Sequence, residues 1–229
     1  MNDYPAEARR IIAAARSGGW VLEPEAKRLF GLAGFDLPRF ALARTAEEAL
    51  RFAGEIGYPV AAKVISPRIL HKSDAGGVAV GIPAAGGLEE AFRRFRKLDG
   101  FAGMLVEEMV SGVELILGAK IDVQFGPMVL LGMGGTGVEI YQDIALRMAP
   151  LAERDAAAMI AALRARRLLD GYRGAEAVNR EKLIATILAF SAVAMDLEGL
   201  IASIDINPLI CSARRCVVAD ARIILGEYA

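Results

Sequence analysis

Two apolar, β-prone runs enclose a polar loop between residues 60 and 82, and this stretch constrains the fold more than any other part of the chain. The first run contains Lys63, and the loop contains His71, the single histidine of the chain, before it ends at Gly76 and Gly77. A lysine in a buried strand offers a compact positive charge to phosphate oxygens, and glycines allow backbone N–H groups to approach an anion without a Cβ clash. The stretch therefore predicts a strand–loop–strand unit that binds the phosphates of a nucleotide.

The loop histidine has two interpretations. A lone histidine in a polar loop is commonly structural or solvent-exposed. An imidazole is also largely neutral and nucleophilic near pH 7, which makes His71 a candidate carrier of a phosphoryl group. Lys72 and Ser73 follow it directly, and the positive charge of the lysine suits a phosphate ligand better than a proton-shuttling base.

Composition and charge exclude several classes of protein. The chain of 229 residues is 55% hydrophobic and 24% charged, so it can bury a core and is not disordered. Its net charge is −1 and its pI is about 6.0, without a basic stripe for nucleic acid or a polybasic patch for a membrane surface. The N-terminus does not look like a signal peptide, and the longest apolar run, residues 184–195, is too short to span a bilayer. We therefore expect a soluble cytoplasmic protein.

The two cysteines of the chain, Cys211 and Cys216, lie in a C-x4-C spacing. A zinc site would need two more ligands, and the single histidine is far away in the sequence. We interpret the cysteines as ordinary reduced thiols of a cytosolic protein.

Hydrophobic periodicity and turn residues predict a mixed α and β chain. Its first half is expected to follow the order β-α-β-β-α-β, with a capping box of Thr45 and Glu48 at the start of one helix. A boundary between two lobes is expected near residues 108–112. We predict helices over residues 6–16, 23–34, 45–57, 87–98, 152–169 and 180–197, and strands over residues 39–43, 60–65, 78–82, 104–109, 113–123, 127–133, 200–206 and 216–221.

The segment Gly132–Gly137 matches the pattern G-x-G-x-x-G of dinucleotide-binding folds. In those folds a helix opens directly after the glycines. Here residues 138–143 alternate in polarity like a strand, and Pro150 then interrupts the chain. We therefore predict a glycine-rich hairpin or mobile loop instead of a Rossmann fold.

Acidic residues lie where the chain is expected to cross between lobes. Glu107 and Met109 belong to the end of one predicted strand, and Glu114 opens the next. Backbone groups at such an edge can read adenine, and a carboxylate can bind the hydroxyls of ribose. The alternative is a polar strand end at the surface, and the local pattern leaves both interpretations open.

Two acids and an asparagine interrupt the apolar closing strands. Asp205 and Asn207 share one face of the first strand, and Asp220 and Arg222 share one face of the second. If the strands pair, a carboxylate and an amide oxygen meet, and such hard oxygens beside a triphosphate suit Mg²⁺. The alternative is a surface turn with an ion pair between Asp and Arg. Arg147 is a further candidate contact of a phosphate, and the alternative interpretation is an ordinary arginine at the surface.

Together these segments resemble the ATP-grasp domain of nucleoside-diphosphate-forming acyl-CoA synthetases, and the length resembles a free-standing β subunit of an ADP-forming acetate–CoA ligase. The combination of H-K-S-D-A-G-G-V with D-I-N-P-L and D-A-R-I carries the resemblance, within residues 59–82, 105–122, 132–151 and 204–223. It implies an α+β ATP-grasp fold in which two α/β lobes hold a nucleotide in the cleft between them. The implied first lobe, residues 21–108, is inserted into a second lobe of residues 1–20 and 109–229.

The resemblance also implies roles for individual residues. His71 matches a histidine that accepts phosphate during a relay, and Asn207 and Asp220 match the Mg²⁺ ligands. An aromatic residue often precedes the arginine that Arg147 matches, whereas Leu146 stands here. The candidate contacts of ATP or ADP, from the local pattern and the resemblance together, are Lys63, Ser73, Gly76, Gly77, Glu107, Met109, Glu114 and Arg147.

The implied activity is that of an acid–thiol ligase, acyl-CoA + ADP + phosphate ⇌ carboxylic acid + CoA + ATP. A CoA-binding α subunit would form the acyl phosphate, and this chain would pass phosphate through His71 to ADP, in an expected α2β2 assembly. One alternative is a nucleotide-sensing module that binds ATP or ADP and regulates a partner without turnover. Another is a carboxylate–amine ligase of the same fold, for which 229 residues leave little room. We expect no nucleic-acid or membrane partner.

Overall fold

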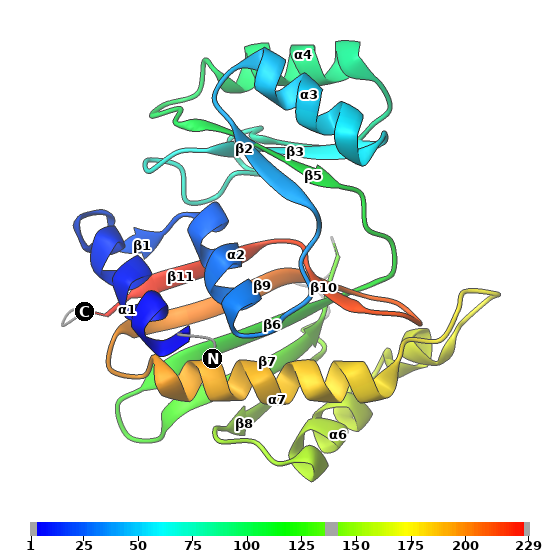
Figure 1. Ribbon diagram of the computed structural model, residues 1–229. Helices are drawn as coiled ribbons and strands as arrows, with labels where there is room; N and C mark the ends of the chain where they lie inside the picture. The colour runs from blue at the N-terminus through cyan, green and yellow to red at the C-terminus, as the bar shows by residue number, and fades with distance from the viewer. Residues whose placement is uncertain (1–3, 136–141, 227–229) are drawn as a thin grey trace. The chain divides into compact units, whose positions relative to one another are not determined.

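The computed structural model describes residues 4–135 and 142–226, and its sheets and helices separate into two units (Figure 1). Unit 1 comprises residues 1–37 and 111–229, and unit 2 comprises residues 38–110. Each unit has a sheet and a hydrophobic core of its own. Unit 2 is thus an insertion in the sequence of unit 1.

The first boundary between the units lies later in the chain than the sequence predicted. A first lobe beginning at residue 21 would have included helix α2 (Glu23–Leu32). In the structure, Leu29 and Phe30 of α2 are fully buried in the core of unit 1, where the rings of Phe30 and Phe190 stack with 6.2 Å between centroids. This tertiary contact assigns α2 to unit 1, and local periodicity does not reveal it.

Unit 2 is a four-stranded antiparallel sheet in the order β2-β5-β3-β4, with helices α3 and α4 on one face (Figure 1). The predicted order β-α-β-β-α-β is confirmed. Alternation along β3 directs Val60, Ala62 and Val64 into the core of this unit. The elements are β2 (Phe40–Ala43), α3 (Ala46–Ile56), β3 (Val60–Ile65), β4 (Val78–Ile82), α4 (Ala85–Phe95) and β5 (Gly103–Glu108).

Helix α3 begins with the capping hydroxyl that the sequence predicted. The Glu48 N–H donates a hydrogen bond to the Thr45 hydroxyl at 3.2 Å. The Glu48 carboxylate accepts a second bond from the N–H of Arg44 at 2.7 Å, one residue before the cap. Two backbone donors at the start of the helix therefore find side-chain acceptors, which they need because the helix itself offers none.

Unit 1 is built on an antiparallel sheet in the order β1-β11-β9-β6-β7-β8, and β10 pairs with β9 beside this path. Helices α1, α2, α6 and α7 contribute buried residues to one core on one face of the sheet, across which α7 runs (Figure 1). The elements are α1 (Tyr4–Ala15), η1 (Arg16–Gly18), β1 (Trp20–Val21), α2, β6 (Val113–Asp122), β7 (Gly126–Met133), β8 (Ile144–Met148), α6 (Glu153–Ala162), η2 (Arg166–Asp170), α7 (Arg180–Asp196), β9 (Ile201–Cys211), β10 (Cys216–Val218) and β11 (Ala221–Leu225).

The opposite face of this sheet, called here the open face of unit 1, carries a different set of residues. Along β6, Leu115, Leu117 and Ala119 are buried in the core that the helices share. Ile116 and Lys120 alternate with them and therefore lie on the other side of the strand. The candidate residues on β9 and β11 described below belong to this open face.

One predicted helix, residues 152–169, is shorter in the structure. Helix α6 ends at Ala162, and the next residue has an extended backbone with ψ of 131°. The Asp143 carboxylate accepts hydrogen bonds from the N–H groups of Arg164 at 2.7 Å and Ala165 at 2.8 Å. An acid from a distant part of the chain therefore takes the donors that would have continued the helix.

The predicted strand over residues 216–221 is divided into β10 and β11. The division lies opposite Pro208 of β9, where the N–H of Ala219 donates to the Pro208 carbonyl at 3.1 Å. Proline has no N–H to return a hydrogen bond, so the ladder is interrupted at this point. Strand β9 itself continues to Cys211, beyond its predicted end at residue 206.

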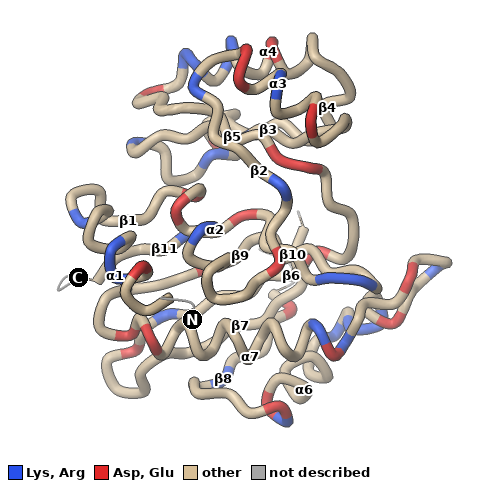
Figure 2. Tube along the Cα trace, viewed as in Figure 1, with Lys and Arg blue, Asp and Glu red and all other residues tan. Residues whose placement is uncertain are grey.

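The structure shows how hydropathy and charge are distributed over the described residues. Among the residues that the structure describes, no helix combines the length and the apolar character needed to cross a bilayer. Figure 2 shows acidic and basic positions interspersed along each unit.

Candidate functional site

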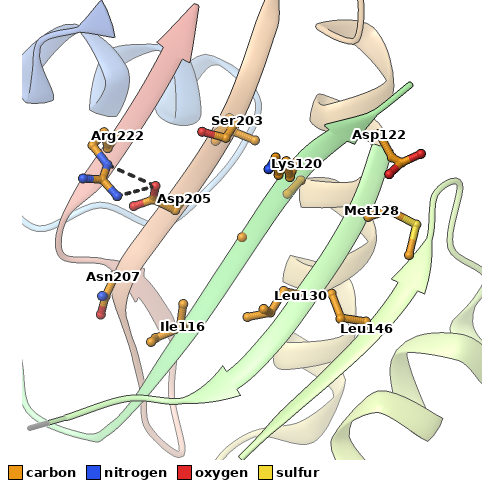
Figure 3. A pocket seen from close by; sticks show the side chains of 13 residues that line it. Ile116, Lys120, Asp122, Met128, Leu130, Leu146, Ser203, Asp205, Asn207 and Arg222 are labelled. Carbon is orange, nitrogen blue, oxygen red and sulfur yellow. Dashed lines mark hydrogen bonds and ion pairs between the residues drawn. The ribbon is translucent and has the colours of Figure 1, made fainter. Parts of the chain in front are cut away.

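The open face of unit 1 contains a hollow of about 510 Å³ (Figure 3). Strands β6, β7 and β8 contribute its apolar side chains, and the polar side chains come from β6, β9 and β11. Its lining side chains include Ile116, Met128, Leu130 and Leu146 in the apolar part, and Lys120, Asp122, Ser203, Asp205, Asn207 and Arg222 in the polar part. A volume of this size is typical of small-molecule sites, and the division suits a ligand with a flat apolar part and a charged part.

The predicted pairing of the closing strands is confirmed. Ile206 lies opposite Ala221 in the β9–β11 ladder, and the Asn207 N–H donates to the Asp220 carbonyl at 3.2 Å. Asn207 lines the hollow, and Asp220 lies beside it on the neighbouring chain segment without contributing to the lining. The structure therefore brings the two candidate metal ligands together.

The donor set fits Mg²⁺ in kind. An amide oxygen and a carboxylate are hard ligands, and Mg²⁺ in phosphate-binding sites commonly takes one or two carboxylates, with phosphates and waters completing the shell. Within the part of the chain that the structure describes, no group of three or more His, Cys, Asp or Glu side chains is placed to hold a metal ion. Asn207 and Asp220 would supply two protein ligands, and oxygens of a bound ligand and of water would complete the coordination shell of the ion.

An ion pair joins β9 to β11 within the hollow. The Arg222 guanidinium donates to the Asp205 carboxylate, with Nε–Oδ1 and Nη2–Oδ1 distances of 3.1 Å (Figure 3). The two residues lie directly opposite each other in the ladder. The ion pair that the sequence offered as the alternative to a metal site is therefore present, and it leaves Asn207 outside the pair.

Unit 2 holds a second ion pair, which is buried. The Lys63 Nζ lies 3.0 Å from the Glu107 Oε2, and only 8% and 3% of these side chains are exposed. Lys63 is opposite Leu105 on β5, and Ala61 is opposite Glu107, so the two charged residues are diagonal neighbours on one face of the sheet. The Glu107 carboxylate therefore orients the Lys63 ammonium. Glu107 is also predicted to lie at the strand edge that binds adenine, which gives this residue a second candidate role.

The glycines that close the loop have their N–H groups engaged inside the loop. The Gly76 N–H donates to the Ser73 carbonyl at 3.0 Å, and the Gly77 N–H donates to the Lys72 carbonyl at 2.7 Å. The sequence predicted that these N–H groups bind phosphate, whereas in this structure they donate to carbonyls of the loop itself. Instead, Gly76 supplies a left-handed backbone with φ of 66°, which favours glycine.

Gly77 is required by space. A Cβ at this position would lie 2.3 Å from Cγ1 of Val64 on β3. The loop is thus pressed against the strand that carries Lys63. His71 lies at the start of this turn and is exposed, as is Ser73. The fold therefore presents the imidazole at the surface of unit 2.

Glu114 and Met109 lie near the ends of their strands. Glu114 is exposed on β6, and its carbonyl accepts a hydrogen bond from the Gly134 N–H at 2.7 Å. A Cβ on Gly134 would come within 3.0 Å of the Glu114 backbone, so only glycine allows this approach. Met109 is 40% exposed, and its sulfur accepts from the Gly81 N–H at 3.4 Å. Residues 136–141, which include part of the predicted glycine hairpin and strand, lie outside the described residues.

Arg147 is not brought to the hollow. It lies opposite Val129 in the β7–β8 ladder, and Val129 is buried in the helix-covered core. Directly opposed residues share a face, so Arg147 belongs to the helix side of the sheet. Its guanidinium donates to the carbonyl of Leu146 at 2.7 Å. Leu146, the residue that departs from the family's aromatic pattern, faces the hollow instead.

Several residues of the hollow were not singled out by the sequence. They include Lys120 and Ser203 in the polar part, and Met128 and Leu130 in the apolar part. Period-two alternation places each of them on one face of a strand, but it does not tell which strands become neighbours. The order β9-β6-β7-β8 was the missing information.

Known proteins are similar to this chain over nearly its whole length. The family model described as an ATP-grasp domain matches residues 12–225. The chain is 43% identical over 232 residues to the β subunit of acetate–CoA ligase [ADP-forming] I of Pyrococcus furiosus, which covers 97% of this chain and 100% of that relative.

Two solved structures of the dinucleotide-forming acetyl-coenzyme A synthetase 1 of Ca. Korarchaeum cryptofilum are also similar. The complex with coenzyme A, Ca-AMPCP and HgCl⁺ has a TM-score of 0.89 and 38% identity, and the match covers 96% of this chain and 100% of that chain. The complex with coenzyme A and Mg-AMPPCP, described with a phosphohistidine segment pointing towards the nucleotide binding site, has a TM-score of 0.82 and 36% identity over 95% and 99% of the two chains.

Proposed function

We propose that this chain, which belongs to the ATP-grasp family of ADP-forming acetate–CoA ligase β subunits, is the nucleotide-binding subunit of an ADP-forming acyl-CoA synthetase. The reaction is acyl-CoA + ADP + phosphate ⇌ carboxylic acid + CoA + ATP. The observation that carries the proposal is the β9–β11 register, which sets Asn207 and Asp220 side by side at the edge of a hollow of ligand size.

The proposal gives each unit a task in handling phosphate. In unit 1, Asn207 and Asp220 would hold Mg²⁺ through hard oxygens, and the ion would supply charge neutralisation for the transferred phosphoryl group. In unit 2, Lys63 would present a positive charge to phosphate oxygens, with its ammonium held by Glu107 at 3.0 Å. Glu114 and the backbone near Met109 are the proposed contacts of the nucleoside.

We assign His71 the role of phosphoryl acceptor. A ring nitrogen of its exposed imidazole would attack the phosphorus atom of a phosphoryl group delivered by a partner, and the bond from phosphorus to the partner's carrier atom would break. In the second step, a terminal phosphate oxygen of ADP would attack the same phosphorus atom, and the N–P bond would break to give ATP and free imidazole. The exposure of His71 on its loop and the neighbouring Lys72 support this role.

A partner subunit completes the proposed enzyme. The Pyrococcus furiosus relative is named a β subunit, and the Korarchaeum structures are described as complexes with coenzyme A. We therefore propose a CoA-binding α subunit, an α2β2 assembly and a cytoplasmic location. Selection of the acyl group would then belong to the α subunit.

The full reaction tests the proposal. With the α subunit, acetyl-CoA, ADP, phosphate and Mg²⁺, Asp220→Ala should lower the rate of ATP formation about 10²–10³-fold, the usual effect of losing one charge-stabilising contact. Glu176→Gln, at an exposed carboxylate outside the hollow, is the matched control and should leave the rate unchanged. Equal rates for Asp220→Ala and wild type, or no binding of any adenine or guanine nucleotide in calorimetry, would overturn the proposal.

The same reaction mixture separates an enzyme from a nucleotide-sensing module. A catalytic relay should leave an acid-labile phosphoryl group on His71 when ADP is omitted, and His71→Ala should lose turnover while it retains ADP binding. A sensing module would bind ADP without labelling the histidine. Wild-type turnover by His71→Ala would remove this residue from the relay without affecting the assignment of the metal ligands.

A further inference from the structure

Cys211 and Cys216 lie directly opposite each other on the β9–β10 hairpin. In the adjacent pair, the Ser212 N–H donates to the Arg215 carbonyl at 2.9 Å. Hydrogen-bonded and non-hydrogen-bonded pairs alternate along antiparallel strands, so the cysteine pair is a non-hydrogen-bonded one. Side chains approach each other closely in such pairs, and their Cα separation of about 4.5 Å lies within the range that a disulfide bond requires.

The two thiols are chemically unequal. Both are free and buried in the core of unit 1. The hydrogen bond from the Cys211 thiol lowers the pKa of Cys216, and the same bond, with burial, raises the pKa of Cys211. Burial and Asp36 oppose the lowering at Cys216, whereas a hydrogen bond from Thr186 and the charge of Lys182 on α7 favour it. Cys216 is therefore the better thiolate, and Cys211 is positioned as the second thiol.

We propose that Cys211 and Cys216 form a redox-active pair that is converted to a cross-strand disulfide by a small-molecule disulfide, RSSR. The Cys216 thiolate attacks one sulfur of RSSR, which forms a mixed disulfide and releases RS⁻. The Cys211 sulfur loses its proton and attacks the Cys216 sulfur, which forms the intramolecular bond and releases a second RS⁻. One protein dithiol and one RSSR thus give one protein disulfide and two RSH, so atoms and electrons balance.

Access to the sulfur atoms requires only a local change. Strand β10 has three residues and lies beside the main path of the sheet, paired with β9 and bridged to Asp36. Release of this short strand would expose Cys216 while the rest of the sheet stays paired, as in local opening of other proteins. The two cysteines are not among the residues that line the hollow.

Mass spectrometry of the full chain tests the pair. The folded chain is incubated with glutathione disulfide, and remaining thiols are trapped with iodoacetamide. We expect a cross-linked peptide that joins Cys211 to Cys216. Cys211→Ser should stop at a mixed disulfide on Cys216, and Cys216→Ser should leave Cys211 unmodified. A wild-type chain that carries two trapped thiols when folded, yet oxidises once denatured, would overturn the proposal, as would equal reaction of the two single variants.

A charge variant tests the assigned direction of attack. Lys182→Gln removes the positive charge near Cys216, so the thiolate fraction and the rate of mixed-disulfide formation in the Cys211→Ser background should fall severalfold at neutral pH. Glu181→Gln, the adjacent exposed position on α7, is the matched control and should not slow the reaction. Circular dichroism confirms that each variant is folded. An unchanged rate in Lys182→Gln would overturn the assignment of Cys216 as the attacking thiolate.

Discussion

Two ion pairs, Lys63–Glu107 and Arg222–Asp205, lie in contrasting surroundings. In unit 2, Lys63 and Glu107 pair at 3.0 Å with 8% and 3% of their side chains exposed. In unit 1, Arg222 and Asp205 pair at 3.1 Å with 31% and 26% exposed. A buried charge that loses its partner is strongly destabilising, whereas a partly exposed charge retains contact with water. The loss of its partner should therefore cost more for Lys63 than for Arg222.

The largest expected effect comes from removing one member of the buried pair. Glu107→Gln keeps the shape of the side chain but removes the negative charge beside Lys63. We expect the free energy of unfolding to fall by about 3–5 kcal/mol, because the ammonium would stay buried without its carboxylate. Urea denaturation at neutral pH measures this change.

A double variant is the control for that prediction. Lys63→Met combined with Glu107→Leu replaces both charges with apolar groups of similar size, so most of the lost stability should return. If Glu107→Gln alone cost less than about 1 kcal/mol, the value typical of exposed pairs, the contrast between the two ion pairs would be wrong.

A smaller effect is expected from glycines that differ in the space around them. A Cβ at Gly77 in unit 2 would lie 2.3 Å from Val64 Cγ1, whereas a Cβ at Gly118 in the hollow of unit 1 would have its nearest neighbour at 3.8 Å. Gly77→Ala should therefore lower the free energy of unfolding by about 1–3 kcal/mol through overpacking. Gly118→Ala, the matched control, should stay within about 0.5 kcal/mol of wild type. Equal losses in thermal unfolding would contradict this reading of the loop.

The smallest effect is expected at the partly exposed pair of Arg222 and Asp205. Asp205→Asn removes the charge that Arg222 contacts, and the free energy of unfolding should change by no more than about 1 kcal/mol, because water solvates the guanidinium. Denaturation under the conditions used for Glu107→Gln makes the two values comparable. A loss as large as that in unit 2 would show that Arg222 is as firmly held as Lys63.

The sequence was informative where the deciding contacts lie close along the chain. Alternation of polarity predicted the strands on either side of the His71 loop and placed Lys63 inside one of them. It also predicted that a carboxylate and an amide would meet if the closing strands paired, and the register sets Asn207 beside Asp220. The hydroxyl of Thr45 was predictable as a cap because its partner is three residues away.

Distant contacts decided the features that the sequence did not reveal. The end of α6 depends on the Asp143 carboxylate, which comes from the segment before β8. The assignment of α2 to unit 1 depends on the stacking of Phe30 with Phe190. The face on which Arg147 lies depends on its pairing with Val129. Each of these outcomes requires knowledge of which segments become neighbours, and a single sequence does not contain it in local form.

The way unit 2 is connected has a consequence for how such a chain can change over time. Its first and last strands, β2 and β5, are neighbours, with Phe40 opposite Glu107, and the Glu108 N–H donates to the Arg39 carbonyl at 2.9 Å. The polypeptide therefore enters and leaves this unit through adjoining strands. Residues 38–110 form a cassette that recombination can add, remove or exchange without rerouting any strand of the sheet into which it is inserted.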